Sequence, residues 1–329
     1  MLNGKRILIT GGTGSFGKAF VKCVLKFFDP EKIIIYSRDE FKQYKMRQSF
    51  TSPKLRFFIG DVRDEKRLNI ALNGVDIVVH AAAMKHVGAS EYNPTEAIAT
   101  NILGAQNVIN ACLDRGVKNI IALSTDKACN PVNLYGATKL CSDKLFIAAN
   151  SYAANSETKF SVVRYGNVLG SRGSVIPLFM EMAKKGCKEL PITDERMTRF
   201  WITLPQAVDF VIESFKIMRG GEMFIPKIPS MRIVDLAEAI IPGCVKKNIG
   251  IRPGEKLHEV MISKDDSRNL YEYEGRYIKL PDFPYWSQKG APDGYKLIKD
   301  GFEYSSDSNT QWLNVEELRN LLNQEGVIE

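Results

Sequence analysis

The chain of 329 residues is longer than one ordinary hydrophobic core requires, and its length suggests two units. Its 44% hydrophobic and 25% charged residues are typical of a globular protein, and no apolar run approaches the ~20 residues that span a bilayer, so we expect no membrane insertion. The net charge of +7 comes from lysines and arginines that are scattered along the sequence. A solvated surface explains this charge more simply than an anionic partner does, so we expect no nucleic acid partner.

The cysteines and histidines do not form the spacing of a metal site. The cysteines are Cys23, Cys112, Cys129, Cys141, Cys187 and Cys244, and the histidines are His80, His86 and His258. No pair of cysteines makes C-x-x-C, and the first residues run into a strand pattern without a signal-peptide core. We therefore expect reduced thiols, a cytoplasmic location and no metal.

Short β-branched runs alternate with helical patterns through the first half of the chain. The predicted strands are Arg6–Ile9, Lys32–Tyr36, Leu55–Ile59, Ile77–His80, Ile120–Leu123 and Phe160–Arg164. The predicted helices are Phe16–Phe28, Phe41–Phe50, Glu65–Leu72, Thr95–Arg115 and Tyr135–Ala149. The strands are apolar on nearly every residue, which predicts burial on both faces, and the alternation predicts a doubly wound α/β fold of the Rossmann type with a parallel sheet.

Beyond about residue 170 the alternation weakens, while glycines and prolines become more frequent. We predict a nucleotide-binding domain over residues 1–170 and a smaller, mixed α/β substrate lobe over 171–329, with an interleaved boundary. The segment 302-FEYSSDSNTQWLNVEELRNLL-322 predicts a polar loop followed by a short amphipathic helix.

A glycine-rich turn, 10-TGGTGSFG-17, follows the first strand and precedes the first helix. Glycines at this place let the backbone turn tightly and approach a pyrophosphate, which also meets the N–H groups of the helix N-terminus. The motif alone is weak, but this position in the chain is the one that dinucleotide binding requires. The alternative is a glycine turn that binds nothing.

The end of the second strand suggests which dinucleotide binds. Ser37 and Arg38 come before Asp39, and a hydroxyl beside a guanidinium suits the 2′-phosphate of NADP. The alternative is that Asp39 binds the ribose of NAD. After the third strand, Asp61 is a candidate acceptor for the adenine amino group, or else the N-cap of the next helix.

Tyr135 and Lys139 form a Tyr-x-x-x-Lys pair at the start of a helical segment, after the fifth strand. An ammonium beside a phenol lowers the phenol pKa from its usual ~10, which creates a base for an alcohol that gives hydride to a nicotinamide. The preceding loop, 124-STDK-127, directs the Ser124 and Thr125 hydroxyls to the same place.

At this point the sequence resembles the extended short-chain dehydrogenase/reductases that act on nucleotide sugars, over nearly the whole chain. Within them it is most similar to the soluble, inverting UDP-N-acetylglucosamine 4,6-dehydratases, which begin bacterial pseudaminic acid synthesis, a route to flagellin glycosylation. The motifs that carry the resemblance are 10-TGGTGSFG-17, 36-YSRDE-40, 81-AAAMKHV-87, 124-STDKACNPVNLYGATK-139, 164-RYGNVLGSRGS-174, 193-TDERMTRFWIT-203 and 251-IRPGEKLHE-259.

The resemblance implies a reaction in which the sugar is oxidised at C4, loses water across C5 and C6, and takes hydride back at C6. Retaining relatives carry Asp-Glu where this chain has Asp126-Lys127; by resemblance to the inverting group, Lys127 removes the C5 proton and Asp126 is the acid at O6. Lysine acts as a base only when its pKa falls well below ~10.4, and a neighbouring carboxylate opposes that fall, so this assignment depends on the resemblance.

The remaining site residues follow from the turns and from the resemblance. The predicted catalytic residues are Thr125, Asp126, Lys127 and Tyr135. The predicted NADP contacts are Gly11, Thr13, Gly14, Ser15, Phe16, Gly17, Ser37, Arg38, Lys42, Asp61, Val62, Ala81, Tyr135 and Lys139. The predicted contacts to the UDP-sugar are Lys85, Asn167, Thr193, Arg199, Arg252 and Glu255, each of which is otherwise a turn, cap or surface residue. The resemblance also implies a homo-oligomer, possibly a hexamer.

Three other functions compete with the dehydratase. A nucleotide-sugar 5-epimerase, or a bifunctional relative of the capsule pathway, shares almost every motif, because the C5 carbanion can be reprotonated without loss of water. A plain dehydrogenase needs cofactor in proportion to product. A non-catalytic NADP sensor does not need the intact pair of Tyr135 and Lys139.

Overall fold

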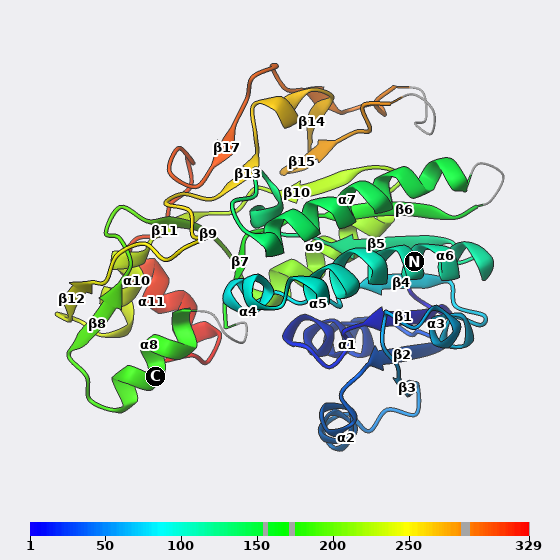
Figure 1. The fold of residues 1–329 in the computed structure, drawn as a ribbon, viewed down its shortest axis with the longest axis horizontal. Helices are drawn as coiled ribbons and strands as arrows, with labels where there is room; N and C mark the ends of the chain where they lie inside the picture. The colour runs from blue at the N-terminus through cyan, green and yellow to red at the C-terminus, as the bar shows by residue number, and fades with distance from the viewer. Residues whose placement is uncertain (154–156, 171–174, 284–289, 329) are drawn as a thin grey trace.

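A ten-stranded sheet dominates the computed structural model, which describes residues 1–153, 157–170, 175–283 and 290–328 (Figure 1). The strand order is β16-β14-β15-β10-β6-β5-β4-β1-β2-β3. The strands from β3 to β10 run parallel to their neighbours, whereas β15, β14 and β16 are antiparallel additions. The predicted Rossmann-type α/β fold is confirmed.

The strands of this sheet are β1 (Arg6–Thr10), β2 (Lys32–Ser37), β3 (Leu55–Ile59), β4 (Ile77–His80), β5 (Asn119–Leu123), β6 (Lys159–Val163), β10 (Met223–Pro226), β14 (Leu270–Tyr273), β15 (Arg276–Lys279) and β16 (Lys296–Leu297). All six predicted strands form, with ends within one residue of the prediction. Every residue of β4 is buried, as expected for a strand that is covered on both faces.

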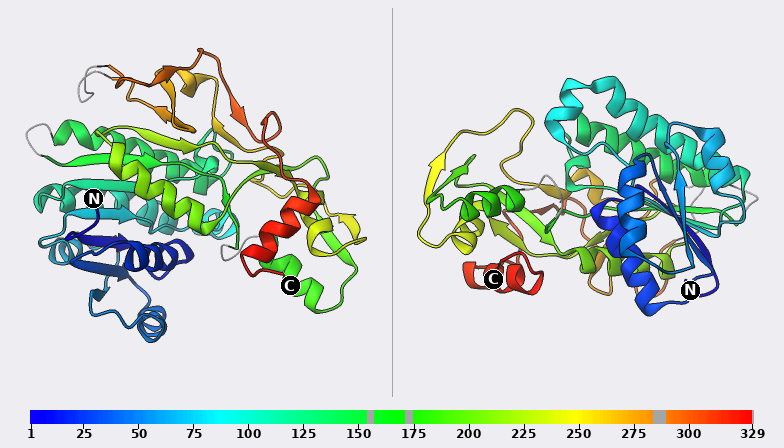
Figure 2. Two further views of the ribbon diagram at one scale, coloured as in Figure 1. Left: turned by 180° about the vertical axis from the view of Figure 1, so that it is seen from behind. Right: turned by 90° about the horizontal axis from the view of Figure 1, so that it is seen from below.

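The helices that flank the sheet are α1 (Ser15–Phe27), α2 (Glu40–Ser49), α3 (Glu65–Ala71), α4 (Val87–Tyr92), α5 (Pro94–Ile98), α6 (Gly104–Asp114), α7 (Leu134–Tyr152) and α9 (Leu204–Ile217). Helix α1 packs against α9, while α6 lies between α3 and α7, so both faces of the sheet are covered (Figures 1 and 2). The predicted helical segment from Thr95 to Arg115 forms as α5, the π-helical turn η1 (Ala99–Leu103) and α6, which follow one another without a break.

A smaller group of elements has its own core. It contains β7 (Asn167–Val168), α8 (Val175–Lys184), β8 (Glu189–Ile192), β9 (Thr198–Ile202), β11 (Ser230–Arg232), α10 (Ile233–Ile240), β12 (Val245–Asn248), β13 (Val260–Ile262), β17 (Tyr304–Ser305) and α11 (Val315–Gln324). Strand β8 pairs with β12, β9 lies between β11 and β7, and β13 pairs with β17. Trp201 and Phe179 are fully buried in the core of this lobe.

The C-terminal segment folds as its sequence indicates. Helix α11 buries Leu318 and Leu322, and Asn314 and Glu317 form a reciprocal capping box at its start. The lobe and the large sheet are interleaved, because β10, β14, β15 and β16 come from beyond residue 170. The division at residue 170 stays a prediction. No helix in the described parts of the chain is long and apolar enough to span a bilayer.

Candidate active site

The glycine turn has the packing that a dinucleotide requires. Gly11 has φ +64°, and a Cβ there would lie 3.0 Å from the Ala81 backbone. A Cβ on Gly17 would lie 2.4 Å from the Gly12 carbonyl oxygen, so only glycine lets α1 approach the turn. Gly14 is the N-cap of α1, and no side chain caps the helix there. The turn therefore fits a pyrophosphate at a helix N-terminus.

The residues around this turn are arranged consistently with cofactor binding. Thr13 is buried, Ser15 is the first residue of α1, and Phe16 packs on the core with its ring stacked near Phe20. Their contacts to the cofactor stay predictions.

Three polar residues with different exposure lie at the end of β2, where Ser37 is buried, Asp39 is partly buried and Arg38 is exposed. Arg38 has a side chain that is 55% exposed, and Ser37 keeps its hydroxyl 3.1 Å from the Gln43 amide nitrogen. Asp39 caps α2 by accepting from the Lys42 backbone N–H at 2.9 Å, and its other carboxylate oxygen pairs with the Lys42 Nζ at 2.7 Å. The Asp39 carboxylate is therefore already used within α2, and the contacts of Ser37 and Arg38 to a cofactor stay predictions.

Asp61 follows β3 and is held by arginines. It accepts from Arg63 Nη2 at 2.8 Å, and Arg38 Nη1 lies 3.6 Å away. Burial raises the pKa of Asp61, but the bonds from Arg63 and the Arg38 charge outweigh it, so the net shift is downward. The N-cap of α3 is Asp64, so the alternative in which Asp61 caps that helix is wrong. The adjacent Val62 is buried.

A buried histidine fixes the end of β4 against β1. The Thr10 hydroxyl accepts from the backbone N–H groups of Ala81 and Ala82, both at 3.1 Å, and lies 2.9 Å from His80 Nδ1. Burial, together with the Lys139 charge, lowers the pKa of His80 to about 3. A neutral imidazole therefore accepts from Thr10 and holds the Ala81 segment in place.

Asn101 is a site residue that the sequence prediction missed. It lies in the π-helical turn η1, and its amide clamps the Met84 backbone, accepting from the N–H at 2.8 Å and donating to the carbonyl at 2.9 Å. It also donates to Thr138 Oγ1 at 2.9 Å. The loop that carries the exposed Lys85 is thereby fixed to α7, one residue from Lys139. Such turns are frequent at functional sites, but no local sequence signal marks this one.

Lys127 lies in the short 3-10 turn η2 (Asp126–Ala128) and is surrounded by acceptors. Its Nζ is 3.0 Å from Asp126 Oδ1, 3.2 Å from Asn167 Oδ1 and 3.3 Å from Glu259 Oε1. Thr125 also donates to Asp126 Oδ1, at 3.0 Å. The structure thus brings Thr125, Asp126, Lys127 and Asn167 together as predicted, and it adds Glu259.

The charges in this cluster shift the pKa values of both Lys127 and Tyr135. Burial lowers the pKa of Lys127, but Asp126 and Glu259 outweigh it, and the net shift is upward. Burial raises the pKa of Tyr135 to about 12, opposed first by the Lys127 charge and then by a Thr125 hydrogen bond. Lys127 is therefore coupled electrostatically to Tyr135, and it is held as an ammonium ion in the protein alone.

Helix α7 places Tyr135 beside this cluster. Asn133 caps the helix by accepting from the Gly136 N–H at 2.8 Å, and a Cβ on Gly136 would lie 2.1 Å from the Lys127 carbonyl oxygen. Glycine is therefore required for η2 and α7 to pack so closely. Lys139 is buried one turn further along, and burial lowers its pKa against the charge of Asp143.

Behind Tyr135 and Lys139 lies a buried polar network. Asp143 accepts from the Ser124 hydroxyl at 2.6 Å and from Arg164 Nη2 at 3.4 Å. Arg164 also donates to the Met261 carbonyl at 3.0 Å, which connects α7 to β13. Burial raises the pKa of Asp143, opposed by Arg164 and Lys139. The network supports the catalytic helix from the side away from the cluster.

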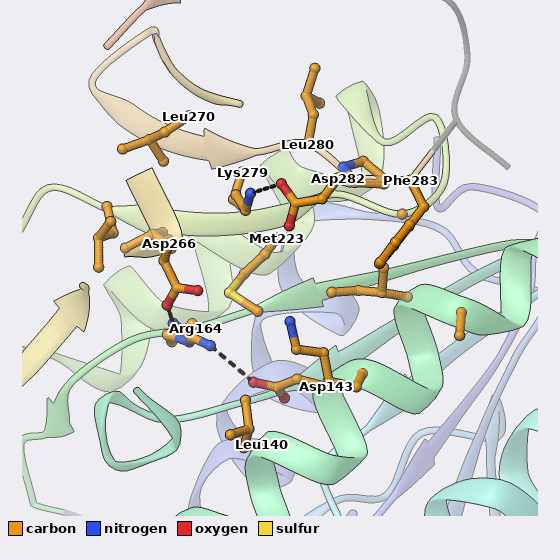
Figure 3. Close-up of a pocket in the computed structure, with 17 residues that line it drawn as sticks. Leu140, Asp143, Arg164, Met223, Asp266, Leu270, Lys279, Leu280, Asp282 and Phe283 are labelled. Atoms are coloured by element: carbon orange, nitrogen blue, oxygen red, sulfur yellow. Dashed lines mark hydrogen bonds and ion pairs between the residues drawn. The ribbon is translucent and has the colours of Figure 1, made fainter. Parts of the chain in front are cut away.

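A cavity of about 240 Å³ lies next to this network (Figure 3). It is bounded by α7, β10, β14 and β15, and its walls include Asp143, Arg164 and Met223. Neither Lys127 nor Tyr135 lines this cavity, so it is not the site of the predicted reaction.

Arg252 and Glu255 lie in a loop that is docked on the catalytic stretch. Asn133 donates to the Gly254 carbonyl at 2.8 Å, and Lys256 Nζ donates to the Cys129 carbonyl at 2.5 Å. Arg252 Nη1 lies 3.6 Å from Glu255 Oε1. This docking places both predicted substrate residues beside the start of α7, although 251–259 is distant from it in sequence.

The two other predicted substrate residues occupy different environments. Thr193 follows β8, and its hydroxyl lies 3.3 Å from the sulfur of Met197. Arg199 is buried on β9 and donates to the carbonyls of Thr198, Leu257 and Lys256. Arg199 therefore holds the 256–257 segment, and a direct substrate contact would require it to give up bonds. The end of the predicted motif at 164–174, residues 171–174, lies outside the described residues.

Among the described residues no group of histidine, cysteine, aspartate or glutamate side chains is arranged to hold a metal ion. Glu259, like Asn101, was missed as a site residue. Its only sequence signal was its place in the motif 251-IRPGEKLHE-259, which indicates no contact with Lys127.

Comparisons with known proteins show which chains this one is similar to. The sequence model of the polysaccharide biosynthesis protein family matches residues 7–281. A Campylobacter jejuni protein named UDP-N-acetylglucosamine 4,6-dehydratase (inverting) is 60% identical over 98% of each chain. A Rickettsia akari protein named UDP-glucose 4-epimerase is 44% identical over 97% of this chain and 95% of its own.

Solved structures agree with the fold. Pen from Bacillus thuringiensis superposes with a TM-score of 0.92 at 39% identity, covering 100% of both chains. DesIV, a dTDP-glucose 4,6-dehydratase from Streptomyces venezuelae solved with NAD and TYD bound, has a TM-score of 0.70 at 25% identity over 77% of this chain and 86% of its own. The resemblance seen in the sequence motifs is confirmed, and the chain belongs to the polysaccharide biosynthesis protein family.

Proposed function

We propose that this protein is a UDP-N-acetylglucosamine 4,6-dehydratase that inverts C5 and recycles a bound NADP. The observation that carries the proposal is the position of Lys127, whose Nζ lies 3.0 Å from Asp126 beside the start of the helix that holds Tyr135. This arrangement offers an acid and a base to neighbouring atoms of one sugar. The name of the Campylobacter jejuni relative, at 60% identity, agrees with it.

A nicotinamide dinucleotide whose pyrophosphate is held by the glycine turn would supply the hydride acceptor for C4 and the hydride donor for C6. Tyr135 takes the O4 proton, helped by the charge of Lys127, which opposes the effect of burial on the Tyr135 pKa. The C4 ketone acidifies the C5 proton. Lys127 removes that proton and Asp126 protonates O6, so that water leaves. Asn167, which accepts from Lys127 Nζ at 3.2 Å, orients the lysine.

The preference for NADP over NAD rests on the end of β2. Arg38 has an exposed guanidinium, Lys42 adds an ammonium on the first turn of α2, and Ser37 adds a hydroxyl. Together these groups suit a 2′-phosphate, because a guanidinium makes forked bonds to phosphate oxygens. Asp39 does not compete, since it caps α2 and pairs with Lys42.

The resemblance supports the wider setting of the enzyme. We infer a cytoplasmic homo-oligomer, possibly a hexamer, at the start of pseudaminic acid synthesis for flagellin glycosylation. On the substrate side, Lys85, Arg252 and Glu255 bind the UDP-sugar, with Thr193 further along the lobe. The docked loop that holds Arg252 supports this arrangement.

A sugar-nucleotide epimerase is the second candidate, because relatives named UDP-glucose 4-epimerase are 44% identical to this chain. A 4-epimerase does not need a base for C5, whereas a 5-epimerase needs one but does not lose water. Asp126 and Lys127 together favour elimination, since they provide both an acid and a base.

The test is to incubate the protein with UDP-N-acetylglucosamine in deuterated water and analyse the product by NMR. We expect loss of the 6-hydroxyl, deuterium at C5 and the inverted C5 configuration. Deuterium at C5 with the 6-hydroxyl retained would identify a 5-epimerase, and inversion at C4 alone would identify a 4-epimerase.

A further inference from the structure

Glu259 is a buried carboxylate at the centre of a group of cations. It is 2% exposed, and Oε1 lies 3.3 Å from Lys127 Nζ and 3.8 Å from Arg199 Nε. Lys256 Nζ lies 4.0 Å from Oε2, an atom that is buried and has no hydrogen-bond partner. Contacts between ions therefore hold this carboxylate, and Oε1 is the oxygen that faces Lys127.

The backbone of Glu259 is fixed independently of these contacts. Its N–H donates to the Ser306 hydroxyl at 2.9 Å, and its carbonyl accepts from the Ser306 N–H at 2.8 Å. The Thr198 hydroxyl contacts both Ser306 and His258, at 2.7 and 2.8 Å. A change confined to the end of the Glu259 side chain therefore leaves its position in the fold intact.

The proposed function leaves Lys127 with a difficulty, because an ammonium ion cannot remove a proton. Two carboxylates raise the pKa of Lys127, although Arg199 opposes them. Asp126 is unsuited to relieve this, since the proposed reaction needs it as the acid at O6. The remaining group within reach is Glu259.

We propose that Glu259 takes the proton that Lys127 must lose before it can act as the C5 base; this inference rests on the proposed function. An Nζ–H bond breaks and an Oε1–H bond forms, which converts a buried ion pair into a neutral amine and a neutral acid. The neutral pair is less costly to keep away from water. Glu259 does not touch the sugar, so it is a positioning residue that acts through Lys127.

The protons balance over one turnover. Lys127 gives one to Glu259 and takes one from C5, and Tyr135 takes one from O4. Asp126 gives one to O6, and a water molecule gives one to C5 on the opposite face. The protons then held by Glu259 and Tyr135 replace those two, which returns the site to its starting state.

The decisive variant is Glu259→Gln, because its amide oxygen still accepts a hydrogen bond from Lys127 but cannot take a proton. We expect reduction of the bound cofactor, followed by its absorbance in a single turnover, to stay within a few fold of wild type. Deuterium incorporation at C5 should fall by ~10²-fold or more, the usual effect of losing a proton acceptor. KM for the sugar nucleotide should change little.

The opposite result would overturn the proposal. If Glu259 only stabilises the Lys127 ammonium, removing its charge lowers the Lys127 pKa, and C5 exchange at neutral pH should be unchanged or faster. Glu259→Asp keeps a carboxylate but moves it away from Lys127 Nζ, and its rate of exchange at C5 should lie between those of wild type and Glu259→Gln. If Glu259→Gln does not fold, Glu259→Asp becomes the test. Exchange at the wild-type rate in Glu259→Asp would then overturn the proposal.

Glu272→Gln is the matched control, since it breaks a glutamate–lysine pair between β14 and Lys227, and it should exchange at the wild-type rate. The wild-type protein tests the proposed function separately. Wild-type protein that gives no dehydrated product and no C5 deuterium would contradict the dehydratase assignment before any variant is compared.

Discussion

Replacing Asn101 with alanine tests how far the substrate loop depends on the π-helical turn. The change removes three hydrogen bonds of 2.8–2.9 Å, two to the Met84 backbone and one to Thr138. Each is worth about 0.5–1.5 kcal/mol net, and a stranded buried group costs more. Because Met84 is only partly buried, water can replace some of the loss, so we expect the free energy of unfolding to fall by about 2–4 kcal/mol.

The change should also weaken substrate binding. Release of the Met84 backbone frees the loop that carries Lys85, so KM for the sugar nucleotide should rise by about tenfold, as a loss of ~1.4 kcal/mol in binding implies. The assays are urea unfolding at fixed protein concentration and steady-state kinetics. Asn110→Ala is the control, because the hydrogen bonds of Asn110 join it to the side chains of Gln106 and Glu65. Equal losses of stability in the two variants, with an unchanged KM, would refute the reasoning.

Three further predictions follow from charges. Arg38→Ala should weaken NADP binding and leave NAD binding nearly unchanged, as measured by the two dissociation constants; equal weakening would mean a general electrostatic role. Lys127→Ala should raise the pKa of Tyr135, because the charge of the lysine lowers that pKa in the wild-type protein. The pH profile of cofactor reduction should therefore move to higher pH, and exchange at C5 should be abolished. A pH profile that does not move would contradict the electrostatic coupling between Lys127 and Tyr135. His80 has a pKa of about 3 when folded and ~6.5 when unfolded, so the unfolded chain binds more protons between these values. The contribution of His80 to the free energy of unfolding should therefore be fully present above pH ~6.5 and should be lost as the pH falls toward 3. The free energy of unfolding of His80→Gln should decline less steeply over this range, and that of the control His86→Gln, in which an exposed histidine is replaced, should match wild type.

The strands and helices of the nucleotide-binding half could be predicted because residues close together in the sequence determine them. Buried parallel strands are apolar at nearly every residue, and the glycine turn is fixed by close backbone contacts such as that between Gly17 and Gly12. The position of Tyr135 four residues before Lys139 predicted their helix in the same way.

The features that were missed depend on contacts distant in sequence. Asn101 acts through a π-helical turn, which neither periodicity nor propensity reveals. Glu259 meets Lys127 only after β13 has paired with β17, and Arg199 looked like a substrate ligand until its carbonyl partners were known. The sequence shows the chemical type of each of these residues, but the tertiary fold determines what each one contacts.

The order of strands in the large sheet has a consequence for synthesis on the ribosome. Strand β6 pairs with β5 on one side and with β10 on the other, and β10 begins only at Met223. While the intervening residues are still being translated, the outer edge of β6 has no partner, and a bare parallel edge can recruit strands from neighbouring nascent chains. A fragment that stops at residue 170 keeps that edge permanently open. Chaperone capture should therefore be greatest in the interval between the completion of β6 and the emergence of β10.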